Sequence, residues 1–324
     1  MVRMLRRSGP LADGLLMLFT IPAAVLLKLV RRIGLQNMPL CKEVLLRVGV
    51  FPVRNHYYEP QFDFRGMGPQ LARDRRLPGV DLNVAGQLRQ LEELRFADEL
   101  RDVGHGPPTR AADDLEFRFG NVTFESGDAE YWYQLLRARK PRRLFEIGSG
   151  HSTLMARRAI TRNQRDDPHY SCRHVCIEPY EMPWLERAGV EVIRQRVEFL
   201  DPAVFAELEA GDVLFIDSSH VIRPQGDVVF EYLELLPTLR PGVIVHAHDI
   251  FTPRDYPQEW VVDRVRLWNE QYLLEAFLTH NHDWQILAAL NYLKHNHYEH
   301  LQAVAPHLLP EREPCSFYLQ RVSR

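Results

Sequence analysis

A glycine-rich turn between an apolar run and a helix-like segment constrains the fold of this chain most strongly. Residues 144–147 read Leu-Phe-Glu-Ile, as expected of a buried parallel strand. They run directly into Gly148-Ser149-Gly150, and residues 154–160 continue as an expected helix. Because glycine carries no Cβ, such a turn lets a ligand approach the backbone closely. The pattern predicts an open α/β sheet with a nucleotide-like cofactor bound at this turn.

From about residue 117 onward, strand candidates alternate with helical segments. This rhythm is typical of a parallel sheet with helices on both faces. Two further strands are expected near the end of the chain, and the last favours an antiparallel strand because only a short loop precedes it. The expected strands are Arg143–Ile147, His174–Glu178, Val190–Arg194, Asp212–Asp217, Val243–His248, Trp284–Ala289 and Ser316–Val322. The expected helices are Asp128–Ala138, Ser152–Thr161, Pro183–Ala188, Pro202–Glu209 and Gly226–Leu239.

Residues 1–115 are interpreted as a helical N-terminal extension, and residues 116–324 as the main domain. An apolar helix is expected over about 11–30, followed by helical stretches at Val44–Val50 and Val84–Leu100; an aromatic segment, Asn55–Phe62, could form a lid. The uncharged run Gly14–Leu27 is shorter than the roughly 20 residues of a bilayer span. Two alternatives therefore stay open for residues 11–32: peripheral contact with a membrane, or packing on the protein's own domain or on a second subunit of a homodimer.

The amino-acid composition limits which binding partners and which cellular compartment are expected. The formal net charge of −3 offers no case for nucleic-acid binding. Four cysteines are too few and too scattered for a disulfide scaffold, so a reducing, cytoplasmic compartment is expected. If the apolar helix docks, the protein would be peripheral on the inner membrane.

Acidic and polar residues follow several expected strands, at the edge where open α/β sheets bind ligands. Glu178 ends the second strand and could accept hydrogen bonds from both hydroxyls of a ribose. The third position of a dinucleotide fingerprint is Thr153 here, and Glu146 lies two residues before the first glycine. A pyrophosphate would not favour that carboxylate, whereas a cofactor with an amino group and a sulfonium charge could. The cofactor-binding residues are predicted to be Glu146, Gly148, Ser149, Gly150, Ser152, Glu178 and Asp217.

These motifs resemble those of class I S-adenosylmethionine-dependent methyltransferases over roughly residues 117–324. Glu146–Gly150 resembles the family's first motif, and Glu178-Pro179 its ribose-binding position. Leu214–His220 and Pro241–Asp249 resemble the fourth and fifth strands of the macrocin O-methyltransferase and cephalosporin-hydroxylase-like subgroup. The resemblance implies an α/β fold: a Rossmann-like, seven-stranded, mostly parallel sheet with a reversed last strand. It also implies S-adenosylmethionine as the cofactor.

Two mechanisms remain open for activating the methyl acceptor. In the first, a histidine removes the proton of the acceptor hydroxyl, and the candidate catalytic residues are His220, His248 and Asp249. In the second, Asp217, His248 and Asp249 bind a divalent metal ion that polarises that hydroxyl. His246 could instead only order the following loop.

The leading hypothesis is an S-adenosylmethionine-dependent methyltransferase acting on a hydroxyl, less readily an amine, of a small-molecule, sugar or lipid-linked acceptor. One alternative is a metal-dependent, hydroxylase-like relative on the same fold. Another is a non-catalytic, membrane-docked interaction protein.

Overall fold

The computed structural model describes residues 9–54, 58, 60, 66–107, 115–180 and 182–322. The chain divides into two compact units, Met1–Met67 and Gly68–Arg324. We had placed a boundary near residue 115, but the described part of 68–115 belongs to the second unit. Its side chains pack into that unit's cores: Leu91 and Leu100 lie in one, while Val80 and Leu82 pack against the other. Apolar contacts hold this stretch to the sheet domain.

The N-terminal unit is helical, as expected. Helix α2 (Gly9–Ile33) is longer than the predicted 11–30, and a short 3-10 turn (Leu35–Asn37) connects it to α3 (Pro39–Val48). Helix α3 ends at Gly49, whose left-handed backbone lets its N–H bond the carbonyl of Leu45. Residues Ala12–Ile33 have a mean hydropathy of 1.9 over their most apolar window, 6% of which is buried. By length and composition this helix could cross a membrane.

The second unit is built on a seven-stranded sheet of order β3-β2-β1-β4-β5-β7-β6. Strand β7 runs antiparallel to its neighbours β5 and β6, and the other pairings are parallel. The predicted fold class, with its reversed last strand, is confirmed. The strands are β1 (Arg143–Ile147), β2 (Arg173–Ile177), β3 (Glu191–Ile193), β4 (Val213–Ile216), β5 (Ile244–Ala247), β6 (Trp284–Ala289) and β7 (Phe317–Arg321).

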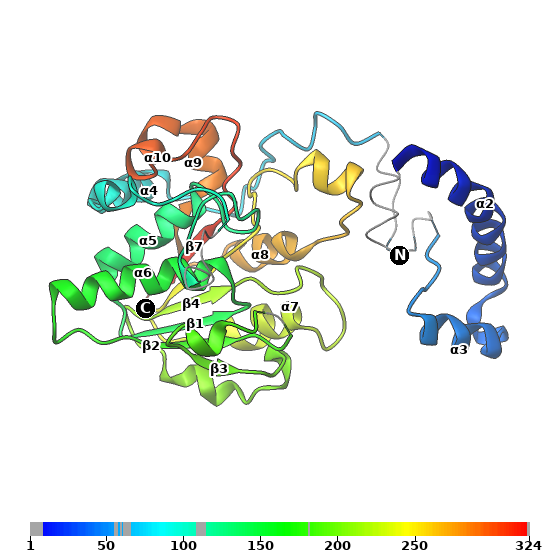
Figure 1. Cartoon of the computed structure of the whole chain (residues 1–324), viewed down its shortest axis with the longest axis horizontal. Coiled ribbons are helices and arrows are strands. Elements are labelled where there is room, and N and C mark those ends of the chain that lie inside the picture. The colour runs from blue at the N-terminus through cyan, green and yellow to red at the C-terminus, as the bar shows by residue number, and fades with distance from the viewer. Residues whose placement is uncertain are drawn as a thin grey trace. The chain divides into compact units, whose positions relative to one another are not determined.

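Helices cover both faces of the sheet and form two apolar cores (Figure 1). One core is closed by α4 (Val84–Glu93), α5 (Asp128–Arg139), α6 (His151–Asp166), α9 (Leu290–Asn296) and α10 (Tyr298–Val304). The other is closed by α7 (Asp227–Val229), its π-type continuation Phe230–Leu235, and α8 (Glu270–Leu278). The sheet is therefore buried on both faces, which explains why its parallel strands read as continuous apolar runs.

Several expected helices are shorter than predicted. The stretch Val84–Leu100 breaks at the extended residue Leu94 and resumes as a 3-10 turn, Ala97–Leu100. The segments around β3 form only the 3-10 turns Leu185–Arg187 and Pro202–Glu207. Gly226–Leu239 ends in a 3-10 turn, Leu236–Thr238. Such short segments gain little from helix propagation without a long apolar face.

Candidate functional site

The ends of four parallel strands meet at one edge of the sheet. The hydrogen bonds of the ladder continue one residue beyond the strands: Gly148 N–H donates to the carbonyl of Ile177 at 3.0 Å, and Asp217 N–H to that of Ile147 at 2.8 Å. His248 N–H donates in the same way to Ile216 at 2.9 Å. Residues distant in sequence are thereby fixed side by side, as the predicted parallel register requires.

Gly148 is the residue on which the turn depends. Its φ is +76°, and a Cβ built on it would lie 1.9 Å from the carbonyl oxygen of Asp217. Any other residue would be strained in this backbone conformation and would also push β1 and β4 apart. Gly150 differs, because a Cβ there would first meet the Met182 Cε at 3.6 Å. The first glycine is thus a structural requirement of the fold, whereas the second leaves open space.

A cavity of about 830 Å³ opens at this edge. Its volume lies within the roughly 300–1,000 Å³ typical of small-molecule sites. Six of the seven predicted cofactor-binding residues line it: Gly148, Ser149, Gly150, Ser152, Glu178 and Asp217. Sequence reasoning missed further lining residues, among them Thr123, Phe124, Tyr180, Met182, Arg196 and Ser219. Apart from Ser219, which lies within the Leu214–His220 motif, they come from loops without a recognisable motif.

Glu178 lies at the end of β2 with its carboxylate held in place. Oε1 accepts a hydrogen bond from Tyr180 N–H at 2.9 Å, and Oε2 accepts one from Ser149 N–H at 3.4 Å. A carboxylate has about four acceptor positions. The backbone therefore keeps the orientation of a hydrogen-bond acceptor at the lining of the cavity.

Glu146 does not line the cavity, in contrast to its predicted role in binding the cofactor. It is fully buried on the opposite face of β1, where Oε2 accepts hydrogen bonds from the hydroxyls of Ser152 and Thr153, each at 2.9 Å. Oε1 pairs with His174. Because side chains alternate along a strand, Ile147 faces the cavity and Glu146 faces away. Glu146 instead anchors the start of α6 behind the glycine turn.

His220 is held between carboxylates and is buried. Its Nδ1 lies 2.7 Å from Glu270 Oε2, and its Nε2 lies 3.2 Å from Asp217 Oδ1 and 3.4 Å from Asp249 Oδ2. Burial alone would lower the pKa of His220, but these carboxylates raise it well above its usual value. Both ring nitrogens are engaged and the ring is cationic at neutral pH, so the predicted role of general base does not fit this environment.

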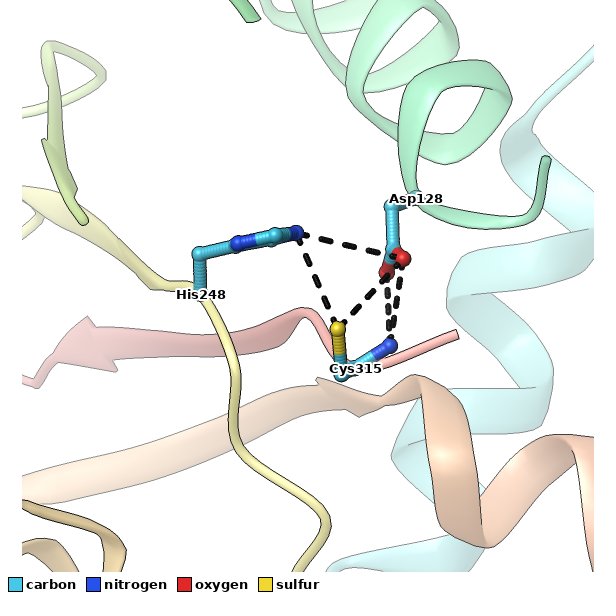
Figure 2. Close-up of side chains that lie close together, drawn as sticks. All are labelled: Asp128, His248 and Cys315. Carbon is cyan, nitrogen blue, oxygen red and sulfur yellow. Dashed lines mark hydrogen bonds and ion pairs between the residues drawn. The ribbon is translucent and has the colours of Figure 1, made fainter. Parts of the chain in front are cut away.

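His248 is divided between two groups of side chains. Its Nδ1 faces Asp249 Oδ1 at 3.5 Å and Asp217 Oδ1 at 3.7 Å. Its Nε2 faces away from these, toward Asp128 and Cys315 (Figure 2). Burial would lower the pKa of His248, but Asp249 and Asp217 raise it to about 9. Like His220, it is a cation at neutral pH and is poorly suited to accept a proton.

The structure therefore groups the predicted metal ligands Asp217, His248 and Asp249 differently. Asp217, His220 and Asp249 each offer a donor atom within 4.8 Å of the others. His248 groups instead with Asp128 and Cys315. Burial opposes ionisation of Asp217, yet the charges of His248 and His220 hold the pKa of its carboxyl far below its usual value. Once a metal ion displaces the Nε2 proton of His220, two carboxylates and an imidazole suit a divalent cation such as Mn²⁺.

Two site residues adopt strained backbone conformations. His220 has φ +60° and Asp249 has φ +58°, although neither is glycine. Left-handed conformations cost such residues of order 1–3 kcal/mol and gather at functional sites. His220 Nε2 contacts both the Asp217 and the Asp249 carboxylates, so the two strained residues meet at this edge and support its interpretation as a site.

Other candidates from the sequence are resolved as follows. His246 is core: its ring stacks on Tyr318 at 4.2 Å and lies 5.0 Å from Trp132, beside the equally buried Tyr131 and Tyr133. Trp268 stacks on His220 at 4.2 Å, and sequence reasoning missed its neighbour Glu270, which is a partner of His220. Most of the aromatic segment 55–62 lies outside the described residues.

Comparison with known proteins identifies the segment that carries this site. Residues 145–250 match a family model described as a methyltransferase domain. The match spans β1 to β5, so it includes the glycine turn and the strand ends described above, and it confirms the predicted resemblance. A protein of Archaeoglobus fulgidus, described as uncharacterized, is 28% identical over 171 residues, which cover 49% of this chain and 74% of its own length.

Solved structures with similar topology include two methyltransferases. An O-methyltransferase from Bacillus cereus in complex with SAH is 16% identical, with a TM-score of 0.37, over 74% of this chain and 91% of that one. A TDP-rhamnose 3′-O-methyltransferase of calicheamicin biosynthesis is 14% identical, with a TM-score of 0.40, over 73% of this chain and 93% of that one.

Proposed function

We propose that this chain, an S-adenosylmethionine-dependent methyltransferase, transfers the methyl group to a hydroxyl oxygen of a small-molecule acceptor. One observation carries the proposal: the glycine turn, the Glu178 carboxylate and the Asp217 carboxylate line a single cavity of about 830 Å³. One end of that cavity, at the glycine turn and Glu178, would hold the adenosine; the other would lie at Asp217, which is the member of the Asp217–His220–Asp249 group that lines the cavity. The acceptor would lie at the second end.

The residues at the first end fit the cofactor. The Glu178 carboxylate, oriented by backbone N–H groups, would accept hydrogen bonds from the ribose hydroxyls. The absence of side chains at Gly148 and Gly150 leaves the backbone of the turn open to a ligand. When bound, S-adenosylmethionine supplies a methyl group on a positively charged sulfur. The chain's part is to hold the acceptor oxygen in line with that group.

The residues at the second end favour a hydroxyl over an amine. An amine beside the Asp217 and Asp249 carboxylates would be stabilised as an ammonium ion, which has no lone pair for the transfer. A hydroxyl can donate its hydrogen bond to the ionised Asp217 and keep its lone pairs available. Asp217, His220 and Asp249 would hold a divalent metal, which supplies polarisation of the acceptor oxygen.

A radiolabelled transfer assay tests this function. The purified chain is incubated with S-adenosylmethionine labelled in the methyl group and a panel of sugars, phenols and lipid-linked alcohols. We expect label in a product that resists alkaline hydrolysis, as an ether does. Addition of an oxygen atom rather than a methyl group would favour the hydroxylase-like alternative, and S-adenosylmethionine binding without turnover across the panel would favour the non-catalytic one.

Chelation separates the two modes of acceptor activation. We expect loss of transfer after treatment with a chelator and recovery on adding Mn²⁺. Asp217→Asn should not recover, and Glu209→Gln at the opposite, N-terminal end of β4 should behave as the wild type. Full activity in the chelated wild type would exclude the metal from the reaction.

We also propose that α2 anchors the protein in a membrane. The helical segment Ala12–Ile33 is about 33 Å long at 1.5 Å per residue, enough for a hydrocarbon core of about 30 Å, with its uncharged run Gly14–Leu27 inside and its charged side chains, Asp13, Lys28, Arg31 and Arg32, toward its two ends. Leu15 to Phe19 are five successive exposed apolar residues, which cover every side of a helix. A helix lying on the surface needs a polar face, so an inserted helix fits better than the peripheral contact considered above.

Membrane fractionation of the full chain tests the anchor. We expect the protein to stay in the membrane pellet after an alkaline carbonate wash. The double variant Leu18→Arg and Phe19→Arg should move to the soluble fraction, while the charge-matched variant Glu92→Gln and Asp98→Asn should not. Release of the wild type by carbonate would support peripheral contact, and a soluble wild type would refute membrane binding and leave the cytoplasm as its location.

A further inference from the structure

Three buried side chains from distant segments converge behind the candidate site (Figure 2). Asp128 is the first residue of α5, His248 directly follows β5, and Cys315 precedes β7. Their relative exposures are 3%, 3% and 7%. None of them lines the cavity. The cluster is therefore outside the lining of the proposed cofactor pocket, while Asp249 contacts both Cys315 of the cluster and His220 of the Asp217–His220–Asp249 group.

The donor atoms of the cluster form a nearly equilateral triangle. His248 Nε2 lies 3.9 Å from Asp128 Oδ2 and 3.7 Å from Cys315 Sγ, and Sγ lies 3.7 Å from Oδ2. A point equidistant from the three corners is about 2.2 Å from each, because that distance is the side divided by the square root of three. Zinc ligands in proteins lie about 2.0–2.3 Å from the metal. The triangle has the size of a zinc coordination shell.

Hydrogen bonding leaves His248 poorly satisfied. The 3.9 Å separation from Asp128 exceeds the range of an N–H···O hydrogen bond, and a contact to sulfur at 3.7 Å is weak. Among the described residues, Nδ1 has no hydrogen-bond partner. A buried imidazole normally has at least one good partner. A metal ion at Nε2 would supply it.

The donor types select the metal. One thiolate, one imidazole and one carboxylate form a borderline-soft set, which suits zinc and does not suit Mg²⁺ or Ca²⁺. We propose that Asp128, His248 and Cys315 bind one zinc ion. On binding, the S–H bond of Cys315 and the Nε2–H bond of the His248 imidazolium break, Zn–S and Zn–N bonds form beside a Zn–O bond to Asp128, and both protons leave to solvent.

The zinc would act as a clamp behind the reactive edge. It would tie the start of α5 to the end of β5 and the approach to β7. The backbone N–H groups of Cys315 and Ser316 already donate to Asp128, and Ile250 N–H donates to the Cys315 carbonyl, so the zinc would add a side-chain link from His248. Asp249 Oδ1 lies 3.2 Å from Cys315 Sγ, while its Oδ2 faces His220. Zinc binding would remove the S–H that Cys315 directs at Asp249 Oδ1, and that oxygen would be left facing His248 Nδ1 at 3.5 Å, on the imidazole that the zinc holds in place.

Metal analysis and cobalt spectroscopy test the proposal. The full chain, free of any histidine tag, is purified from zinc-supplemented medium; we expect about one tightly held zinc per chain. After replacement by Co²⁺, we expect a cobalt–thiolate charge-transfer band. Cys315→Ser should lose both, whereas Cys172→Ser, which alters a thiol outside the cluster, should keep both.

Three outcomes overturn the proposal. The first is a wild type that neither retains zinc nor takes up cobalt. The second is bound cobalt without a thiolate band, which would place the metal at Asp217, His220 and Asp249. The third is a band that survives in Cys315→Ser. If Cys315→Ser fails to fold, Asp217→Asn decides: it should retain the zinc and the band, since its carboxylate is not a ligand of this site.

Discussion

Replacing Gly148 by alanine tests the packing of the glycine turn. The added Cβ would lie 1.9 Å from the carbonyl oxygen of Asp217, a backbone atom at the end of a central strand. The φ of +76° adds a conformational cost, since a non-glycine residue in this region loses of order 1–3 kcal/mol. Relief of the clash by shifting β1 against β4 costs about 1–3 kcal/mol more. We expect Gly148→Ala to lower the free energy of unfolding by about 3–5 kcal/mol.

Thermal unfolding of the protein without cofactor measures this cost. For a domain of this size, 1 kcal/mol corresponds to roughly 2–4 °C, so the melting temperature should fall by about 6–20 °C. Gly150→Ala is the matched control: its φ of 177° is ordinary extended backbone and its Cβ has space, so its melting temperature should stay within about 2 °C of the wild type. Equal melting temperatures for the two variants would refute the reasoning.

Three further predictions concern stability. Arg137→Met removes a buried guanidinium bonded to Glu99 at 2.8 Å and should cost on the order of 3 kcal/mol in urea unfolding; a change below 1 kcal/mol would contradict it. His246→Phe should keep or raise the melting temperature and leave cofactor binding intact, because neither ring nitrogen has a hydrogen-bond partner in the described structure. Burial opposes ionisation of Glu313, but hydrogen bonds from neighbours including Lys294 lower the pKa of its carboxyl to about 2. The difference in unfolding free energy between the wild type and Glu313→Gln should therefore be largest above pH 4.5, the usual pKa of a glutamate, and should shrink as the pH falls toward 2. A difference that does not change with pH would refute this.

Sequence patterns predicted the sheet well because its strands are buried on both faces. Apolar runs such as Leu144–Ile147 need burial on both faces of the sheet, which two helical layers provide. The turn residues that follow mark the end of each strand. The N-terminal boundary of the second unit was harder to predict from the sequence. Val84–Glu93 is polar in sequence, yet Gln87 receives a hydrogen bond from Ala289 N–H at 2.7 Å and ties this helix to β6. A polar contact at such sequence separation has no local signature.

The site was predicted in outline and misassigned in detail. The parallel register brings Gly148, Glu178 and Asp217 to one edge of the sheet regardless of the conformation of the loops. These positions could therefore be identified from the strand ends alone. The alternation of side chains could also have placed Glu146 on the opposite face. Its partner His174 lies on the same face of the neighbouring strand.

Asp128 and Cys315 could not have been found from the sequence. They meet His248 only because β7 inserts between β5 and β6, which places residues 315 and 128 next to a strand end far from both in sequence. Glu270 illustrates the same limit. It reaches His220 across 50 residues, from a helix with no motif of its own.

Calorimetric titration with S-adenosylhomocysteine tests the central claim most directly, because binding at the strand ends requires neither the acceptor nor turnover. We predict one binding site per chain, and an affinity lower by roughly 10- to 100-fold in Glu178→Gln, which keeps the shape of the side chain and removes its charge. Glu186→Gln, at an exposed carboxylate outside the cavity lining, should bind as the wild type does. The absence of binding of either S-adenosylhomocysteine or S-adenosylmethionine to the folded wild type would contradict the assignment of this edge as the cofactor site.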